Sequence, residues 1–471
     1  MNKKLLLTGI ATAAVLLAGC SLAPKYERPA APVATVFPGD PAQPSGLSAA
    51  SVPWQEFFTD PRLTKLIDLA LANNRDLRVS ALNIEQARAQ FRIQRAALFP
   101  AVGVAASGSR SRPNPFGAIS ASAPSVSSSY AVNLGITAWE IDFFGRITSL
   151  KDAALAQYLA TEESRKAAQI SLIGAVAQGW LTLLADDELL ELTRQTLGTR
   201  NESVRLTKLR FDNGVSSEID FQLANSLAET AKASYAQQQR LRMQDENALV
   251  LLLGAPMPPE AMTGADANKL DSVKSIPDVP AGLPSDLLAE RPDIRAAEQQ
   301  LLAANANIGA ARAAFFPRIS LTTSIGTVSS QFSGLFDSGS KAWSFAPQLS
   351  LPIFNAGANI AGLDSAKAGR DIAVAQYEKS IQSAFRDVAD ALAGRATLTE
   401  QLRAQRAQAD AEGIRFKLSD LRYRNGIASA LDLLDAQRSQ FAAQQATVQA
   451  HLLQLQNQVV LYKALGGGWK E

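Results

Sequence analysis

The chain has 471 residues, 47% of them apolar, and its 46 basic and 44 acidic residues leave a formal net charge of +2. This composition is typical of a packed protein and gives no reason to expect nucleic acid as a partner. A single cysteine, Cys20, excludes an intramolecular disulfide framework, and a single histidine, His451, argues against histidine-based metal sites and catalytic triads. Because P-loop, HExxH and CxxC motifs are also missing from the sequence, we predict that the chain is not an enzyme and has no cofactor or metal.

Residues 1–19 are predicted to be a signal peptide, because Lys3 and Lys4 precede a short apolar stretch. The sequence Leu-Ala-Gly-Cys, which ends at Cys20, is similar to a bacterial lipobox. It predicts that Cys20 becomes the mature N-terminus and carries N-acyl and S-diacylglycerol lipid; a plain signal peptide with a chance cysteine is the alternative. Ser21 in the next position is similar to the signal for sorting to the outer membrane. No later stretch has 18 successive apolar residues, so no transmembrane helix is predicted.

Residues 20–61 contain eight prolines and are predicted to be an extended tether between the lipid and the folded body. A helical pattern begins at Arg62 and runs to Phe99, where Pro100 ends it. We assign residues 62–254 to a first repeat.

After this helix the hydrophobic period changes to two, which is typical of strands with one apolar face. In the clearest case Tyr130, Val132, Leu134, Ile136 and Ala138 share one face. Strands of about ten residues are long enough to cross an outer membrane when tilted. A soluble sandwich with one wet face is the alternative. The four predicted strands are residues 101–110, 130–140, 318–328 and 343–353.

Four strands cannot close a barrel, and an open sheet edge cannot face lipid. The strands must therefore be shared between chains. Two chains would give eight strands and an interior filled by side chains, whereas three would give twelve and leave room for a pore. The sequence alone does not choose between these numbers, but transport requires the pore.

Long stretches poor in glycine and proline follow each pair of strands. A helix of about 65 residues would reach roughly 100 Å, which is enough to cross a periplasm. Residues 255–283 are predicted to be a linker between the halves, and residues 284–471 form the second repeat. The predicted long helices are residues 146–210 and 218–253 in the first repeat, and 355–424 and 429–465 in the second.

Two elements occur twice, which predicts an internal duplication. Residues 211–220 read FDNGVSSEID and residues 423–432 read YRNGIASALD. Residues 95–100 and 312–317 read RAALFP and RAAFFP. Since Asn-Gly favours tight turns, each ten-residue copy is predicted to join two long antiparallel helices.

Several motifs together identify a family. They are the lipobox, the RAALFP and RAAFFP pair, the stretch DFFGR from Asp142, the stretch LPIF from Leu351, the stretch LDAQR from Leu434, and the closing LYKALGGGW. The chain resembles the TolC-type outer-membrane factors, and within them the OprM-like (NodT-type) lipoproteins, over essentially its whole length. This resemblance implies a homotrimer with a twelve-stranded barrel in the outer membrane, four strands coming from each chain, continuous with a twelve-helix periplasmic barrel. It also implies a periplasmic adaptor (membrane fusion protein), an inner-membrane antiporter of the resistance-nodulation-division (RND) class, and export of drugs or similar small molecules.

The same resemblance implies a gate at the periplasmic tip of the helices. It places Leu431 and Asp435 at the narrowest ring, with Asp220 and Asp432 near it. The pairs Ser217–Asp220 and Ser429–Asp432 also fit capping boxes at helix starts, and Asp435 fits an i,i+3 partner of Arg438. Some relatives carry an arginine where this chain has Ala428, so we expect Arg422 or Arg424 to take over any such contact.

The exposed turns are expected to contact the adaptor, although turn geometry alone explains their glycines. Two other functions stay open: the duct of a type I protein-secretion or metal-efflux system, and a purely structural envelope lipoprotein, which would not need four amphipathic strands. The turn residues are Asn213, Gly214, Val215, Asn425, Gly426 and Ile427.

Overall fold

The computed structural model describes residues 21–37, 52–112, 126–262, 269–274, 277 and 284–469. The predicted signal peptide, Cys20 and parts of the predicted tether and linker lie outside these residues. The chain divides into two units. Unit 1 comprises Met1–Ala30, Asn83–Thr161 and Ala296–Tyr377, and unit 2 comprises Ala31–Leu82, Glu162–Arg295 and Glu378–Glu471.

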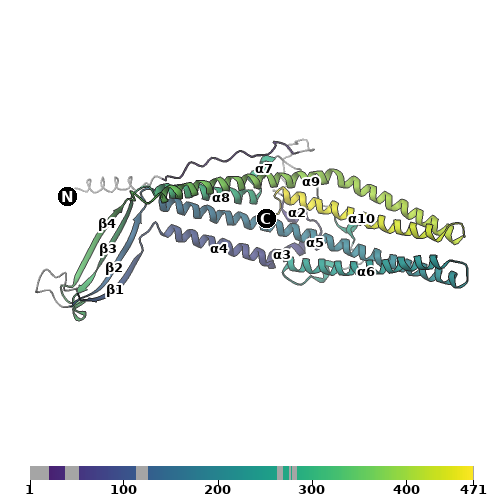
Figure 1. Ribbon diagram of the computed structural model, residues 1–471, viewed down its shortest axis with the longest axis horizontal. Coiled ribbons are helices and arrows are strands. Elements are labelled where there is room, and N and C mark those ends of the chain that lie inside the picture. The colour runs from purple at the N-terminus through teal and green to yellow at the C-terminus, as the bar shows by residue number, and fades with distance from the viewer. Residues whose placement is uncertain are drawn as a thin grey trace. The chain divides into compact units, whose positions relative to one another are not determined.

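The chain forms mainly helices and one sheet (Figure 1). The helices and strands of the described residues are α2 (Trp54–Phe57), α3 (Pro61–Asn73), α4 (Arg75–Ala96), β1 (Val102–Ser111), β2 (Ser127–Ile141), α5 (Arg146–Asp212), α6 (Glu218–Leu253), η3 (Pro259–Met262), η4 (Leu270–Ser272), α7 (Pro284–Glu290), α8 (Pro292–Ala313), β3 (Arg318–Ser329), η5 (Phe332–Gly334), β4 (Lys341–Ser350), α9 (Ala358–Arg424) and α10 (Ala430–Ala464).

The sheet of unit 1 has the order β1-β2-β3-β4, and each neighbouring pair is antiparallel (Figure 1). Within the described residues β1 and β4 each pair with one strand only, so both edges of the sheet are open. The second predicted strand is longer than expected at both ends, and the fourth ends at Ser350, before the predicted residues 351–353.

Cross-strand pairs show that the two faces of the sheet differ. Val104 pairs with Leu134, Leu134 with Ile325, and Ile325 with Trp343, so these four side chains share one face. All four are exposed, from 49% for Leu134 to 78% for Trp343. The opposite face carries mainly serine, threonine, glycine, alanine and asparagine, and its larger side chains are Glu140, Arg318, Val328 and Gln348. One apolar exposed face and one small polar face is the pattern of a transmembrane barrel strand.

A bulge corrects the predicted facing of Ala138 in β2. The register shifts between Ile136 and Trp139, Ala138 has a φ of 50°, and its N–H donates to the Thr322 hydroxyl at 3.1 Å. Because the bulge adds a residue, Trp139 pairs with Leu321 and takes the apolar face that simple alternation assigned to Ala138.

The start of the described chain is held along α8 in unit 1. The Arg312 guanidinium donates to the carbonyl of Leu22 at 3.1 Å, and the Asn305 amide donates to the carbonyl of Pro24 at 2.7 Å. Further along, the buried Glu298 carboxylate accepts from the Tyr26 hydroxyl at 2.9 Å and from Arg28 Nε and Nη2 at 2.7 and 2.8 Å. These contacts run antiparallel to α8, so this part of the predicted tether is docked on the fold.

The predicted tether also ends earlier than expected, because residues 54–60 enter the core of unit 2. Trp54, Phe57 and Phe58 are at most 3% exposed. The Phe57 ring stacks on Tyr462, with centroids 3.9 Å apart, and the Tyr462 hydroxyl donates to the carbonyl of Val52 at 2.6 Å. Large aromatic side chains in this stretch outweigh its proline content, since burying them stabilises the unit.

The predicted continuous helix from Arg62 to Phe99 is broken at Asn74. Asp60 caps α3 by accepting from the Arg62 N–H at 2.9 Å, with Pro61 in the first turn. Asn74 is extended, and its side-chain oxygen accepts from the Leu77 N–H at 2.9 Å while its amide donates to the carbonyl of Leu252. The asparagine therefore ends α3 and begins α4.

Helix α5 contains a stretch long and apolar enough to cross a membrane, the one such helix that the described residues hold. We had predicted none, because no uninterrupted apolar run exists. Most of the stretch is buried; Val176, Trp180 and Leu184 are fully enclosed in unit 2. A buried core helix has the same length and composition.

An acidic pair, the buried Asp186 and the half-buried Asp245, joins α5 to α6 in unit 2. Asp186 is 6% exposed and accepts from the Gln238 amide at 2.8 Å. Burial first, and then a hydrogen bond with Asp245, raise the pKa of Asp186 to about 7. Next to it, Asp187 accepts from Arg242, which also binds Glu246.

This pair predicts that unit 2 loses stability as pH rises. The folded-state pKa of Asp186 lies above its unfolded value of 3.8, so its stabilising contribution is complete below pH 4 and is lost as pH rises through about 7. Asp186→Asn should raise the free energy of unfolding at pH 8 by about 2 kcal/mol and change it little at pH 4. Denaturant unfolding followed by circular dichroism at both pH values measures this. Asp187→Asn is the control and should destabilise at pH 8; an equal loss in both variants would contradict the expectation.

Candidate functional site

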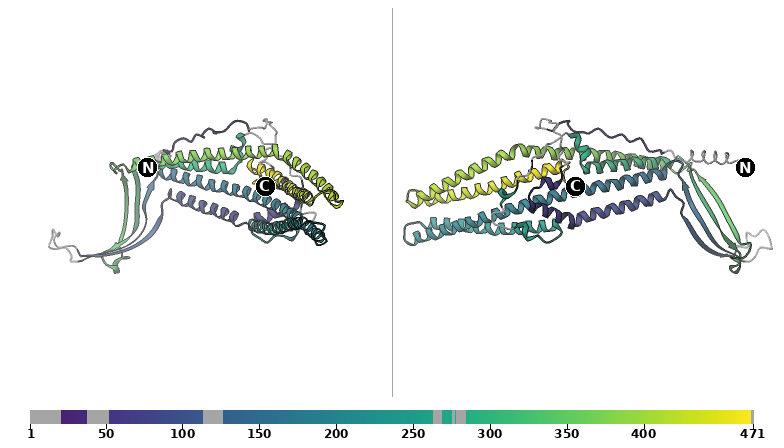
Figure 2. Two further views of the ribbon diagram at one scale, coloured as in Figure 1. Left: turned by 45° about the vertical axis from the view of Figure 1, so that its right-hand side comes forward. Right: turned by 180° about the vertical axis from the view of Figure 1, so that it is seen from behind.

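The duplicated turns have the same geometry in unit 2. Gly214 and Gly426 have φ values of 71° and 75°, which glycine adopts without strain. The Asn213 and Asn425 amides each donate to the carbonyl four residues earlier at 2.7 Å. Figure 2 shows that hairpins α5–α6 and α9–α10 end on the same side of the unit, with their turns next to each other.

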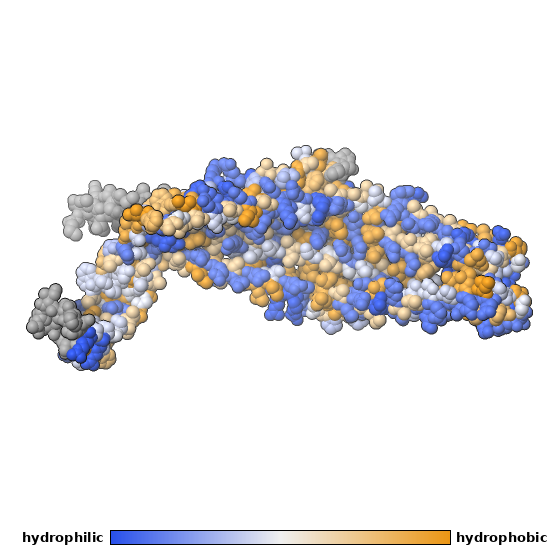
Figure 3. All heavy atoms as spheres, in the orientation of Figure 1, coloured by the Kyte–Doolittle hydropathy of each residue, from blue (hydrophilic) through white to orange (hydrophobic). Residues whose placement is uncertain are grey.

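Two apolar side chains project from these turns. Val215 is 74% exposed and Ile427 is 68% exposed. Neither is needed for the turn, whose hydrogen bonds use their main-chain N–H groups. Figure 3 shows apolar surface between hydrophilic residues where the two hairpins end, at its right-hand side. Exposed apolar residues at equivalent positions of two turns are typical of a protein contact surface.

Asp220 and Asp432 both complete capping boxes. The Ser217 hydroxyl accepts from the Asp220 N–H at 3.1 Å, and the Ser429 hydroxyl accepts from the Asp432 N–H at 3.2 Å. Each carboxylate in turn accepts from the serine N–H. Hydrogen bonds from these serine side chains lower the pKa of both aspartates. The geometry therefore gives both aspartates a structural role at the helix starts.

Asp435 is bound by two arginines. Its carboxylate accepts from Arg415 Nη2 and from Arg438 Nη2, each at 2.6 Å. Arg438 is the i,i+3 partner expected from the sequence, whereas Arg415 lies on α9 and joins the two arms of the hairpin. Arg415 also pairs with Glu412 at 3.3 Å. Together these four residues form a charged cluster one helical turn beyond the capping box of α10.

Leu431 projects from the first turn of α10 and is 62% exposed. Of the two arginines expected to take over the contact of an arginine at position 428, Arg424 pairs with Asp420 of its own helix at 2.8 Å. Arg422 lies close enough to Asp432 to help lower its pKa. In this chain it is Arg415 that holds Asp435.

The two hairpins also contact each other. Arg210 lies over the Tyr423 ring, with its guanidinium carbon 4.6 Å from the centroid. The buried Arg200 donates to the Gln437 side chain at 2.6 Å, and burial lowers the pKa of Arg200. Between these contacts is a groove of about 810 Å³, lined among others by Leu206, Phe416 and Leu434. Polar contacts between the two hairpins therefore border an open groove.

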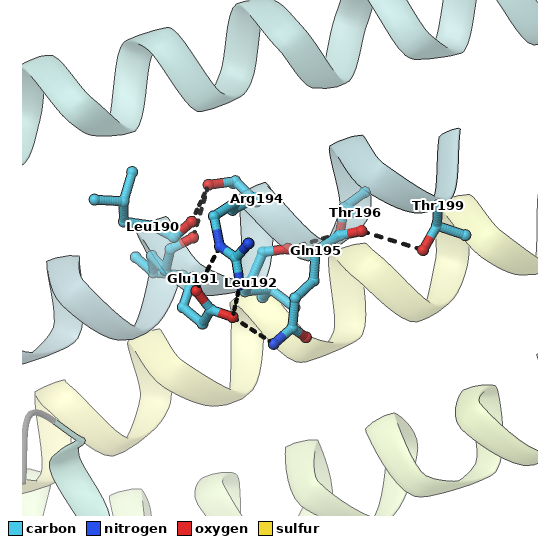
Figure 4. A network of polar contacts seen from close by, with 9 residues as sticks. Leu190, Glu191, Leu192, Arg194, Gln195, Thr196 and Thr199 are labelled. Atoms are coloured by element: carbon cyan, nitrogen blue, oxygen red, sulfur yellow. Dashed lines mark hydrogen bonds and ion pairs between the residues drawn. The ribbon is translucent and has the colours of Figure 1, made fainter. Parts of the chain in front are cut away.

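One network of polar side chains on α5 is satisfied within that helix (Figure 4). Glu191 accepts from Arg194 Nε and Nη2 at 2.8 Å and from the Gln195 amide at 2.7 Å. Hydrogen bonds from Arg194 and then Gln195 lower the pKa of Glu191 to about 2. A carboxyl group that is ionised at neutral pH cannot act as a general acid there. The described residues also contain no group of three acidic, histidine or cysteine side chains placed to hold a metal.

Sequence reasoning missed Arg415 and Arg200. A signal for Arg415 was present, because Arg415 and Asp435 lie ten residues before and after Asn425 and therefore face each other across the hairpin. The first hairpin has no equivalent pair, since Leu223 stands where Asp435 would be. Arg200 carries no such signal, because its partner Gln437 belongs to the other hairpin.

Comparison with known proteins shows relatives that match along the whole chain. TtgC of Pseudomonas putida is described as a probable efflux pump outer membrane protein. It is 49% identical over an aligned length of 475, which covers 100% of this chain and 97% of TtgC. The outer membrane protein OprJ of Pseudomonas aeruginosa is 47% identical over 458 residues, covering 97% of this chain and 95% of OprJ.

Solved structures of two relatives are also similar to this chain over almost its whole length. The open state of the Neisseria gonorrhoeae outer membrane channel MtrE has a TM-score of 0.85 and 43% identity, covering 96% of this chain and 99% of MtrE. CusC has a TM-score of 0.83 and 38% identity, covering 95% and 100%. Residues 66–255 and 283–467 match the family described as "Outer membrane efflux protein". The chain therefore belongs to the outer membrane efflux protein family and is an outer membrane protein.

Proposed function

We propose that this protein is the outer-membrane exit duct of a tripartite efflux system and exports drugs or similar small molecules from the periplasm. Its partners would be a periplasmic adaptor and an RND antiporter. The relatives support this assignment, since the TtgC proteins of two Pseudomonas putida strains are named as outer membrane proteins of efflux pumps. No catalytic step is required of the duct.

One observation carries the proposal: a four-stranded sheet with an exposed apolar face and two open edges. In a membrane such edges must be paired, because unpaired backbone groups in hydrocarbon cost several kcal/mol each. Three copies would pair β1 of each chain with β4 of the next and give a twelve-stranded barrel. The long helices α5, α6, α9 and α10 of each copy would form the periplasmic tube. The two halves of each chain would be copies of one ancestral unit.

The tip would be the gate. In a trimer, three copies of Leu431 and Asp435 would converge on one axis. Leu431 would narrow the lumen with an apolar ring, and Asp435 would place negative charge beside it. Asp220 and Asp432 would hold the starts of α6 and α10 in place. Cys20, with its lipid, would add a second attachment to the membrane.

The subunit number and the transport activity test this proposal. Native mass spectrometry of the detergent-solubilised protein should give three copies, and planar bilayers should show discrete channels. A strain that lacks the gene should become sensitive to drugs and recover with the wild-type copy. Single subunits that conduct ions would contradict the assembly, and unchanged drug sensitivity would contradict the efflux role.

The turns are expected to bind the adaptor through Val215 and Ile427. Changing both to aspartate should abolish drug resistance while the trimer persists, because a charge cannot be buried against an apolar partner without a large desolvation cost. Val215→Thr with Ile427→Thr is the matched control, since threonine keeps the β-branch and adds no charge, and should retain most resistance. Drug susceptibility and native mass measure the two properties. Full resistance of the aspartate variant would place the adaptor contact elsewhere.

A further inference from the structure

Two basic residues lie on the apolar face of the sheet at the end far from the helices. Arg110 follows Val102, Val104 and Ala106 at alternate positions of β1, and it pairs with Ser128. Lys341 begins β4 two residues before Trp343 and pairs with Thr327. Both are exposed, and within the described residues neither side chain makes a hydrogen bond or ion pair. Each therefore stands with its charge free beside the apolar stretch of this face, whose outer positions also carry Ser128 and Thr327.

Aromatic residues surround the same end of the sheet. The Phe332 ring packs edge-on against Tyr130, with centroids 5.5 Å apart, yet Phe332 remains 73% exposed. Phe336 in the same connection is 76% exposed, whereas Leu335 between them is 5% exposed. The connection is ordered by hydrogen bonds such as Gly334 N–H to the Gln331 carbonyl at 3.2 Å. Exposed aromatic rings at the end of an apolar sheet face are typical of the boundary between hydrocarbon and headgroups.

Charge at this end is mostly positive. Arg110, Arg112 and Lys341 are the basic residues among the described residues there, and Asp337 is the acidic one. A basic side chain at the edge of a hydrocarbon layer keeps its stem in the apolar region and reaches the headgroups with its charge. The ligand that complements such cations is an anionic headgroup attached to acyl chains.

Arg110 and Lys341 also stand on the two open edges. β1 ends near Arg110 and β4 begins at Lys341, so an antiparallel pairing of β1 with the β4 of another copy brings both outer ends together. We propose that this seam is a binding site for the phosphates of lipid A, the lipid anchor of lipopolysaccharide in the outer leaflet, with Arg110 from one copy and Lys341 from the next as its ligands. Trp343 and Phe332 would contact the acyl chains. This inference rests on the proposed trimer.

Native mass spectrometry with a defined probe tests the site. Purified wild-type protein is mixed with lipid A carrying two phosphates, and separately with the same lipid after removal of both phosphates. The wild type should bind the phosphorylated lipid roughly tenfold more tightly, since charge-assisted hydrogen bonds to phosphate are the strong ones. Arg110→Gln with Lys341→Gln should lose this preference and keep its affinity for the lipid without phosphate.

Arg318→Gln is the matched control, because Arg318 is a basic residue of the same sheet at the opposite end and on the opposite face. It should bind both lipids as the wild type does. The same spectra count subunits, which separates the two possible failures. Three copies with equal affinity for both lipids, or a double variant that keeps the preference, would overturn the site alone. Single subunits would overturn the proposed assembly and the seam with it.

Discussion

Replacing Leu431 and Asp435 together with serine is expected to raise the conductance of the channel several-fold in planar bilayers. Leu431 supplies the apolar side chain at the tip, and a narrow apolar ring excludes water and ions. Asp435 holds α10 to α9 through Arg415 at 2.6 Å. The double change would therefore remove both the proposed apolar ring and the contact of Asp435 with Arg415.

A single change separates the contact between the two arms from the apolar side chain of Leu431. Arg415→Gln breaks the contact between the arms but leaves Leu431, so we expect a smaller rise that depends on ionic strength. Leu418→Ser serves as the control, because Leu418 is 56% exposed on α9 of the same hairpin. Equal conductance of the double variant and the wild type would show that the narrowest point lies elsewhere.

Gly254→Ala is expected to destabilise unit 2 by about 3 kcal/mol, from left-handed backbone strain and a steric clash. Gly254 ends α6 with a φ of 65°, and its N–H donates to the carbonyl of Val250 at 3.0 Å. A Cβ at this position would lie 2.5 Å from the carbonyl oxygen of Asn73. The carbonyl oxygen and carbon of Asn73 both belong to the main chain, so a side-chain rotation cannot relieve the clash.

The loss should appear as a lower thermal midpoint and a lower yield of folded protein. Gly198→Ala is the matched control, because Gly198 lies within α5 and a Cβ there would meet nothing within 4 Å. That change should stabilise slightly, by up to about 1 kcal/mol, since alanine favours helices. A midpoint for Gly254→Ala equal to that of the wild type would show that α3 can move away from α6.

Much of the fold could be predicted from the sequence because its patterns are local. The period of two in the strands, the two Asn-Gly turns and the serine–aspartate capping pairs all depend on residues within one element. The bulge at Ala138 could not be predicted, since alternation carries no sign of an extra residue. The break at Asn74 has a local part, the hydrogen bond from the Leu77 N–H, and a part that depends on Leu252, which is distant in sequence.

The candidate site was predicted unevenly for the same reason. Positions such as Leu431 and Asp435 came from resemblance, and their gating role stays a prediction. The pairing of Asp435 with Arg438 followed from helix spacing and is confirmed by the structure. The contact of Arg200 with Gln437 arises only when separate hairpins pack, whereas the equal spacing of Arg415 and Asp435 from Asn425 was a signal in the sequence that the prediction did not use.

The two open edges of the sheet also constrain how the protein matures. β1 and β4 have ten residues each, and along each edge alternate N–H and C=O groups point away from the sheet. A lone subunit that entered hydrocarbon would leave all of them unsatisfied, at several kcal/mol apiece. Insertion and association would therefore be a single event, and its rate should rise steeply with the amount of protein waiting at the membrane surface.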